Sequence, residues 1–476
     1  MVLGSLPMAT SGAQFLFDRA LREDVEAIRI EASGQRFSPR QSVTPDGSPR
    51  HTSDYEITVT WKPSEARARE DWVMTTTFPI SDTLIFSLSY AEALGVKEGR
   101  DSFAAAGGGP LGAARVGANL KDLWLTHPMI LAAYAETLPA TRFSIEGRPY
   151  ERMSFFARGT EWTMVVDQST GLPVEISTIE ADPLNARIEN KVRFSDWREV
   201  SGVPFPFRLE QVIDDRLLRR EVRSSITVNP DGADDLLALP SGGPREMDED
   251  RRDWGWSMSH VFLERAGLGG PADHPHIDAV TFHEVGPDIF QIRGSRHHNL
   301  LVVGPEGLAI VDAAWYPERS ETILRHLAER WPDKPLRVLV LSHHHVDHSG
   351  GFRTFVEAGA TLVTSRSNAQ YFERALERVG QQATRIVKVG SHARLDDIGR
   401  TIEVYDVANS HSDGALAVYV PDTKLLFNAD LYSPGRELQF EIYIAELMQA
   451  VRFHGLDVEK HVGGHGAGYL PHTGGD

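Results

Sequence analysis

The sequence predicts an α+β protein of two domains, in which an antiparallel curved β-sheet is followed by an αβ/βα sandwich of two mixed sheets with helices outside. Three observations support this prediction. The 476 residues are too many for a single hydrophobic core. Between about residues 160 and 230, short strands follow one another through turns, as in an antiparallel meander. From Leu308 onward, strand-like segments alternate with helical ones, as in layered structures of sheets and helices.

The chain is expected to have four parts. Residues 1–14 contain small residues but no positively charged start, so we expect them to be the last part of a signal peptide. This predicts export to the periplasm, with a cytoplasmic location as the alternative. Residues 15–232 are expected to form the first domain. Residues 233–278, rich in Gly, Pro and charge, are expected to be a linker, and residues 279–476 the second domain.

Each element of the first domain is expected from the spacing of its apolar residues. Phe15–Ile30 begins with three- and four-residue steps, and Leu120–Leu138 also has helical spacing. Apolar and polar residues alternate in the strands, and turns such as Gly202–Pro206 separate them. The strands expected on these grounds are Tyr55–Trp61, Glu161–Asp167, Glu189–Trp197, Phe207–Ile213 and Leu217–Val228.

The apolar runs of the second domain are short enough to be buried strands. The helices expected between them are Ser320–Arg330 and Gly350–Ala358. The expected strands are Leu308–Asp312, Leu336–Leu341, Ala415–Pro421 and Lys424–Asp430.

The composition restricts the partners. The net charge is −18 and no basic block offsets it, which argues against nucleic acid as a partner. No apolar stretch approaches the ~20 residues that a membrane-spanning helix needs. The chain has no cysteine, so no thiolate is available as a metal ligand. No pattern indicates an oligomeric state.

Four histidines and one aspartate lie within residues 343–348, directly after the apolar run Leu336–Leu341. They therefore lie at the carboxyl end of a buried strand, where open α/β sheets place their ligand sites. Alternate residues of an extended chain point the same way, so His343 and His345 can reach one ion together. Asp347 and His348 can reach a second ion. Imidazole and carboxylate ligands suit zinc, iron or manganese.

Three further polar residues lie near the ends of expected strands or in a short glycine-containing segment. His411 precedes one expected strand, Asp430 ends the next, and His465 lies in the segment His461–Gly466. Alone, a histidine of this kind is usually a hydrogen-bonded polar residue, and an acid that ends a strand is usually a turn residue. Taken alone, none of the three therefore indicates a metal ligand.

The spacing His-x-His-x-Asp-His, with these three residues downstream, resembles the signature of the metallo-β-lactamase superfamily over residues 280–470. The resemblance implies the αβ/βα sandwich and two metal sites. In the first site, His411 would join the first two motif histidines. In the second, His465 would join Asp347 and His348, and Asp430 would bridge the two ions. The ligands implied are His343, His345, His411, Asp347, His348, Asp430 and His465.

The resemblance implies a binuclear zinc hydrolase, with iron or manganese as alternative metals. A hydroxide shared by two ions would attack an ester, lactone, carbamate or amide bond in a small hydrophobic substrate, and Asp347 would also orient it. The segment Asn409–Gly414 departs from the Gly-His-Thr-Pro-Gly-His-Thr of many thioesterase-like members, which argues against glyoxalase II. The absence of cysteine excludes the β-lactamase subclass that uses a Cys ligand.

Other candidate site residues have two interpretations each. Tyr432 either donates a hydrogen bond to a developing oxyanion or packs in the core. His297 and His298 either contact the substrate or form a hydrogen-bonded surface pair. His344, the variable position of the motif, is expected to point away from the metals.

Two alternative functions remain open at this point. One is a mononuclear iron dioxygenase of the same fold. The other is a carrier without catalytic activity, because Asp196–Pro206 resembles part of the periplasmic lipoprotein-carrier-like half-barrel. The concave apolar face of such a half-barrel can hold a lipid or another hydrophobic ligand.

Overall fold

The computed structural model describes residues 25–471, except 92–93, 102–106, 112, 136–139, 240–279, 295–296, 384, 436–438 and 467–468. The expected signal peptide and almost all of the expected linker lie outside the described residues. Export therefore stays a prediction. The chain divides into two compact units, which are described separately. The first unit contains Met1–Pro39, Pro49–Ala181 and Arg187–His274, and the second contains Arg40–Ser48, Asp182–Ala186 and Pro275–Asp476.

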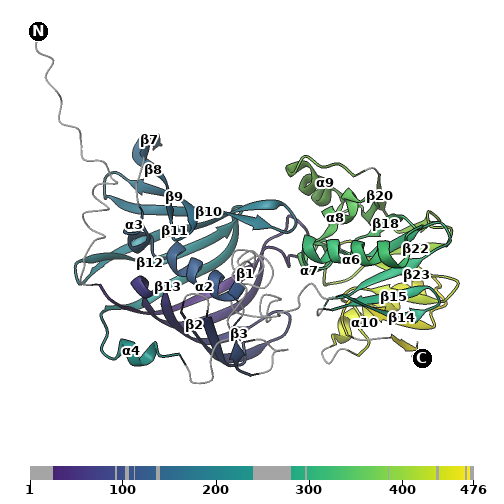
Figure 1. Ribbon diagram of the computed structural model, residues 1–476, viewed down its shortest axis with the longest axis horizontal. Helices are drawn as coiled ribbons and strands as arrows, with labels where there is room; N and C mark the ends of the chain where they lie inside the picture. Colours follow the sequence, from purple (N-terminus) through teal and green to yellow (C-terminus); the bar gives the residue numbers. More distant parts are fainter. Residues whose placement is uncertain are drawn as a thin grey trace, which may run out of the picture. The chain divides into compact units, whose positions relative to one another are not determined.

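The first unit is built on one antiparallel sheet of thirteen strands (Figure 1). Its strand order is β6-β5-β4-β3-β2-β1-β13-β12-β11-β10-β9-β8-β7. Consecutive strands therefore lie side by side, except that β6 and β7 form the two edges of the sheet and β1 pairs with β13. The strands are β1 (Ile28–Ser38), β2 (Arg50–Lys62), β3 (Arg67–Thr76), β4 (Asp82–Ala91), β5 (Leu94–Gly99), β6 (Gly109–Pro110), β7 (Ala140–Ile145), β8 (Arg148–Ala157), β9 (Thr160–Asp167), β10 (Leu172–Asp182), β11 (Ala186–Val200), β12 (Val203–Ile213) and β13 (Arg216–Val228).

One face of this sheet is apolar because apolar residues occupy every second position of its strands. Two helices pack on that face. In β2, Tyr55, Ile57, Val59 and Trp61 are buried in the same cluster. The helices α2 (Ala113–Leu125) and α3 (Pro128–Ala132) contribute their own side chains to that cluster. The rings of Trp61 and Trp124, a residue of α2, meet edge to face at 4.7 Å. Side chains of the chain itself therefore cover the apolar face. The remaining short helices are η1 (Pro63–Glu65) and α4 (Ala233–Leu236).

Two sequence predictions for this unit are wrong. Residues 28–30 end the expected helix Phe15–Ile30, but they begin β1, because this segment pairs with β2 and β13 on its two sides. Residues 15–24 lie outside the described residues. Val203–Pro206 was expected to be part of a turn but belongs to β12. This stretch pairs with β11 on one side only, because β12 pairs with β13 from Arg208 onward. The prolines therefore lie on an edge where no neighbouring strand needs their missing N–H.

The second unit contains two sheets with helices outside them. Its seven-stranded sheet runs β14 (Thr281–Gly286), β15 (Ile289–Arg293), β16 (Asn299–Val303), β17 (Leu308–Val311), β18 (Leu336–Val340), β19 (Thr361–Ser365) and β20 (Ile386–Val389). Its six-stranded sheet runs β21 (His392–Leu395), β22 (Ile402–Val407), β23 (Ala415–Val420), β24 (Leu425–Asn428), β25 (Lys460–Gly463) and β26 (Tyr469–Pro471). Both sheets are mixed, since β17 to β20 and β24–β25 pair in parallel.

The two sheets pack face to face. Val302 and Val340 of one sheet share a buried cluster with Val418 and Phe427 of the other. The helix α10 (Glu441–Phe453) covers the outer face of the six-stranded sheet, where Leu447 packs in a second cluster. The remaining helices are α6 (Pro317–Arg330), α7 (Val346–Ser349), α8 (Phe352–Glu357) and α9 (Ala369–Arg378). The αβ/βα sandwich predicted from the sequence is confirmed.

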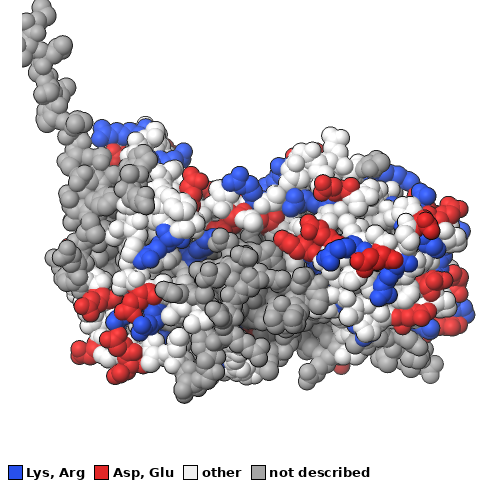
Figure 2. Space-filling view, in the orientation of Figure 1, with Lys and Arg blue, Asp and Glu red and all other residues white. Residues whose placement is uncertain are grey.

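Two further observations concern the surface. On the face drawn in Figure 2, basic and acidic side chains are interspersed over both parts of the chain. Among the described residues, the structure contains no helix with the length and apolar character that a membrane crossing demands.

Candidate metal centre

The histidine-rich loop is held at the end of β18 by backbone hydrogen bonds and one buried carboxylate. The backbone N–H of Leu341 donates to the carbonyl of Val363 at 2.9 Å, which continues the pairing with β19. The next residue, Ser342, donates its N–H to Oδ1 of Asp312 at 2.8 Å. The chain then leaves the sheet, and α7 begins at Val346. The strand end thus turns the motif side chains toward one place, as the sequence predicted.

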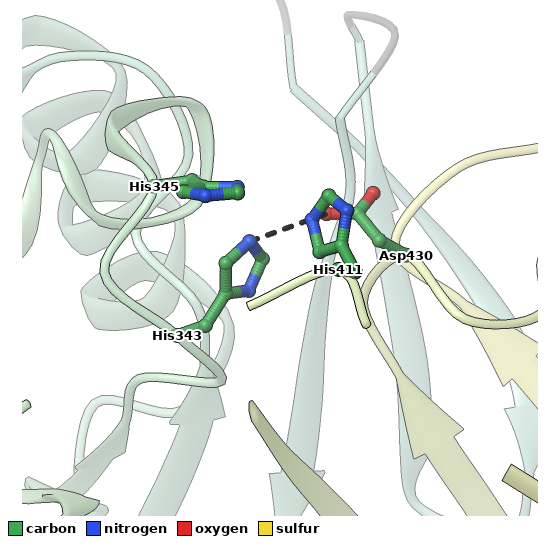
Figure 3. Close-up of side chains that lie close together, drawn as sticks. All are labelled: His343, His345, His411 and Asp430. Carbon is green, nitrogen blue, oxygen red and sulfur yellow. Dashed lines mark ion pairs between the residues drawn. The ribbon is translucent and has the colours of Figure 1, made fainter. Parts of the chain in front are cut away.

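The first group of candidate ligands consists of His343, His345, His411 and Asp430, whose ligand atoms all lie within 4.8 Å of one another (Figure 3). The three imidazoles are buried. Nε2 of His343 lies 3.3 Å from Oδ2 of Asp430, and Nε2 of His411 lies 3.0 Å from the same oxygen. The motif loop, the segment before β23 and the end of β24 therefore meet at one point.

A second group lies beside the first. It consists of His297, His348 and His465, again with ligand atoms within 4.8 Å of one another. Nε2 of His348 lies 3.1 Å from Oδ2 of Asp430, and Nε2 of His465 lies 2.5 Å from Oδ1. The carboxylate of Asp430 thus contacts imidazoles of both groups.

The carboxylate of Asp347 lies next to the second group and accepts two hydrogen bonds. Its Oδ2 is 2.9 Å from Nε2 of His297 and 3.9 Å from Nε2 of His348. Its Oδ1 accepts a hydrogen bond of 2.8 Å from the side-chain amide of Gln41. Burial alone would raise the pKa of Asp347, but the hydrogen bond from His297 and the charge of His348 hold it well below its usual value. This side chain is therefore ionised near neutral pH.

Neighbouring groups fix which nitrogen of two imidazoles is available to a metal. Nδ1 of His348 lies 3.1 Å from Oδ2 of Asp312, and because this carboxylate oxygen is the acceptor, the nitrogen carries the proton. Nε2 of His348 is left facing Asp430. Nε2 of His345 donates to a backbone carbonyl at 3.0 Å, and its buried Nδ1 has no hydrogen-bond partner among the described residues. Buried nitrogens with a free lone pair fit a metal ion, since a buried polar atom is otherwise paired.

The electrostatic field of the site favours a cation. Burial, together with His343 and His411, holds the pKa of His345 well below its usual value, so this imidazole is neutral. Burial alone would raise the pKa of Asp430, but His348, His465 and His411 hold it well below its usual value. Burial opposes a proton on His348, yet Asp430 and the hydrogen bond to Asp312 raise its pKa well above the ordinary value. Neutral imidazoles and ionised carboxylates are the forms that bind metals.

The match to known proteins agrees with this geometry. Residues 293–465 match the family model of the metallo-beta-lactamase superfamily. These residues form a metallo-β-lactamase domain. The match contains every candidate ligand predicted from the sequence, and the ligand roles themselves stay predictions.

Relatives of the metallo-β-lactamase domain include enzymes of different activities. The 2,4-dinitroanisole O-demethylase subunit alpha of Nocardioides sp. (strain JS1661) is 24% identical over 190 residues, which are 39% of this chain and 58% of that protein. The (R)-specific secondary-alkylsulfatase of Pseudomonas sp. is 33% identical over 75 residues, 16% of this chain and 11% of its own length. The chain thus spans less than two thirds of either relative. A solved metallo-beta-lactamase from Pontibacter korlensis covers 40% of this chain and 94% of its own, with 18% identity and a TM-score of 0.33.

The remaining predicted residues of the metallo-β-lactamase domain lie around the two groups. The ring of Tyr432 lies 5.3 Å from that of His461 and packs against the cluster under α10, which favours the packing interpretation. His298 is buried, donates its N–H to the carbonyl of Gly464 at 2.7 Å, and belongs to neither group. Burial and the neighbouring His465 lower its pKa to about 3. His344 belongs to neither group, and its Nε2 lies 3.0 Å from the carbonyl oxygen of Ser42.

Sequence reasoning missed one role and one residue in this site. His297 was considered only as a substrate contact or a surface residue, but the structure brings it into the second group. Its position at the start of the strand beside β17 was the available signal. Gln41 was not considered at all, because it stands 306 residues before Asp347 and lies in no recognisable motif.

Proposed function

We propose that the chain is a metal-dependent hydrolase with a binuclear centre of zinc, or alternatively of iron or manganese. The observation that carries the proposal is the position of Asp430. Its carboxylate contacts His343 and His411 of the first group, and His348 and His465 of the second. A carboxylate that contacts two sets of imidazoles could serve as a ligand to two ions.

The chemistry follows from the donors. Metal ions bound by both groups would polarise the substrate and lower the pKa of a coordinated water toward neutrality. The residues around the centre keep the metal-binding atoms in the protonation states and orientations that binding requires. Asp312 fixes the proton of His348 on Nδ1, and burial keeps His345 neutral. Asp347 keeps a negative charge beside the second group, which favours a cation there.

We propose a small hydrophobic molecule with an ester, lactone, carbamate or amide bond as the substrate. A sulfate ester is a second candidate, because the (R)-specific secondary-alkylsulfatase of Pseudomonas sp. is 33% identical over its matched residues. The O-demethylase relative adds an aryl methyl ether to the compounds worth testing. The loops around the centre choose among these, and fold alone does not.

The two other functions have weaker support. A mononuclear iron dioxygenase needs one group of donors, whereas this centre has two. A carrier of hydrophobic ligands needs an open apolar face, whereas α2 and α3 bury their side chains on the apolar face of the thirteen-stranded sheet.

The first test is elemental analysis of the purified full-length protein, in comparison with Asp430→Ala and with a control. His326→Ala is a suitable control, because His326 lies on the surface of α6 and contacts Glu329 rather than the centre. We expect about two zinc ions per chain in the native protein and in the control, and fewer than one in Asp430→Ala.

Activity is then measured on a panel of nitrocefin, an aryl ester, an acyl-homoserine lactone, an aryl carbamate, an alkyl sulfate, 2,4-dinitroanisole and a phosphodiester. Hydrolysis of any of these that disappears in Asp430→Ala supports the proposal. One iron per chain with oxygen uptake would replace it with the dioxygenase. A protein that binds no metal on titration would overturn it.

A further inference from the structure

The segment Arg40–Ser48 connects β1 to β2 in sequence, but it groups with the unit that contains the candidate metal centre. Hydrogen bonds and ion pairs fasten it there. Arg40 donates to the hydroxyl of Tyr371 at 3.1 Å, and the carbonyl of Val43 accepts from the N–H of Asp413 at 2.8 Å. Asp46 pairs with Arg374 at 2.7 Å. The segment is therefore attached at several points to the metallo-β-lactamase domain.

Between these attachments, two residues of the segment reach the motif loop. The amide nitrogen Nε2 of Gln41 donates to Oδ1 of Asp347 at 2.8 Å. The carbonyl oxygen of Ser42 lies 3.0 Å from Nε2 of His344 and 3.0 Å from Nε2 of His345. Gln41 is only 6% exposed, so its amide meets Asp347 in a place that water scarcely reaches.

The bond from Gln41 has a specific consequence for Asp347. An amide N–H₂ only donates, so it fixes the rotation of the carboxylate by holding Oδ1. Oδ2 then faces His297 and the second group, 3.9 Å from Nε2 of His348. Because the amide carries no charge, it orients the carboxylate without neutralising it, whereas a lysine or arginine here would compete with a metal ion. Partners that hydrogen-bond to metal-binding carboxylates typically change metal affinity 10–100-fold.

We propose that Gln41 is a positioning residue for the metal-binding carboxylate of Asp347, so that the second metal site is incomplete without the segment Arg40–Ser48. This inference rests on the proposed binuclear centre. It assigns part of that centre to residues that precede the matched residues 293–465 by about 250 positions.

The test is Gln41→Met in the full-length protein, because methionine nearly keeps the length of the side chain and removes the amide donor. The matched control is Gln35→Met. Gln35 also donates an amide hydrogen bond to a carboxylate, that of Asp54 at 3.0 Å, but on an exposed part of the first unit. Zinc affinities of the two sites are measured by competition with a chromophoric chelator. The melting temperature of the chelated protein is measured in parallel.

We expect the second zinc ion to bind about 10–100-fold more weakly in Gln41→Met, with the first ion and the melting temperature of the chelated protein unchanged. Gln35→Met should bind both ions like the native protein. The inference fails if Gln41→Met binds the second ion normally. It also fails if the variant loses affinity for both ions together with a fall in melting temperature, since that is a packing defect. A native protein that takes up no zinc overturns the proposed function and this inference with it.

Discussion

The carbonyl oxygen of Ser42 lies 3.0 Å from Nε2 of His345, although 303 residues separate them in the sequence. A carbonyl only accepts, so the proton of this imidazole resides on Nε2 and the lone pair on Nδ1. In the same way, Asp312 places the proton of His348 on Nδ1 and leaves Nε2 facing Asp430. Two candidate ligands thus present different nitrogens to the centre, and in each case a neighbour outside the two groups decides which.

Replacing Asp312 by asparagine tests this control of the imidazole proton. Asparagine keeps one oxygen for the N–H of Ser342, but its amide group cannot accept the proton of His348. We expect zinc affinity at the second group to fall about 10–100-fold and the free energy of unfolding to fall by about 1–3 kcal/mol. Both are measured, by chelator competition and urea unfolding, beside Asp333→Asn, which changes an exposed aspartate. Normal zinc affinity in Asp312→Asn would show that the hydrogen bond serves only the fold.

Zinc is expected to stabilise the protein, and more so as the pH rises. Protons compete with zinc for imidazole nitrogens. Burial lowers the pKa values of His343 and His345, which favours their neutral forms, whereas Asp430 and Asp312 raise that of His348 despite its burial. Zinc must therefore displace a proton from His348 in particular, and its apparent affinity should rise between pH 6 and 8. Melting temperatures with zinc and with EDTA, at both pH values, check this. A difference that shrinks as the pH rises would contradict it.

The sequence predicts part of the candidate site from one local feature, the end of a strand. The short apolar run before His343 and His345 predicts a buried strand by itself, so both side chains are expected at the end of that strand without reference to the rest of the chain. The roles expected for His411, Asp430 and His465 came instead from the resemblance to the metallo-β-lactamase superfamily. Neither the strand end nor the resemblance reaches Gln41 or Ser42, because the contact they make depends on how a loop of Arg40–Ser48 folds against a motif 300 residues away. No periodicity or spacing encodes such a contact.

The two wrong predictions for the first unit also have their cause in contacts between distant segments. Residues 28–30 carry apolar side chains at spacings compatible with both a helix and a strand, and pairing with β2 and β13 decides for the strand. The prolines of Val203–Pro206 indicated a turn, but a strand tolerates proline where the neighbouring strand does not pair. Tertiary pairing thus overrode local preference in both places.

The carboxyl group of Asp406 provides a prediction independent of metals. Burial, and secondarily the charge of Asp413, raises its pKa to about 6, above the value of about 3.9 in an unfolded chain. The folded protein therefore holds this proton more tightly, and stability falls as the pH rises from about 4 to about 6. Asp406→Asn removes that loss. Since the group is half-buried, we expect a gain of about 1 kcal/mol at pH 8 that vanishes near pH 4. Urea unfolding at both pH values measures it, and an equal gain at both would refute the assignment.

At Gly350 the motif loop packs closely against the segment that contains Trp315. A Cβ on this residue would lie 1.9 Å from the carbonyl oxygen of Trp315 and 2.9 Å from that of Val346, both backbone atoms. Trp315 in turn donates its N–H to the carbonyl of Asp347 at 3.2 Å, and its ring lies 4.3 Å from that of His297.

Gly350→Ala must therefore move Trp315, and with it Asp347 and His297. We expect a loss of about 1–3 kcal/mol in the free energy of unfolding, together with weaker binding of the second zinc ion. Gly109→Ala is the control, because a Cβ there would meet nothing within 4 Å, and its effect should stay within about 0.5 kcal/mol. If Gly350→Ala lost stability but bound zinc normally, Trp315 would support the fold alone. If it lost neither, the close approach of the two segments would be wrong, and with it the packing that holds Asp347 in place.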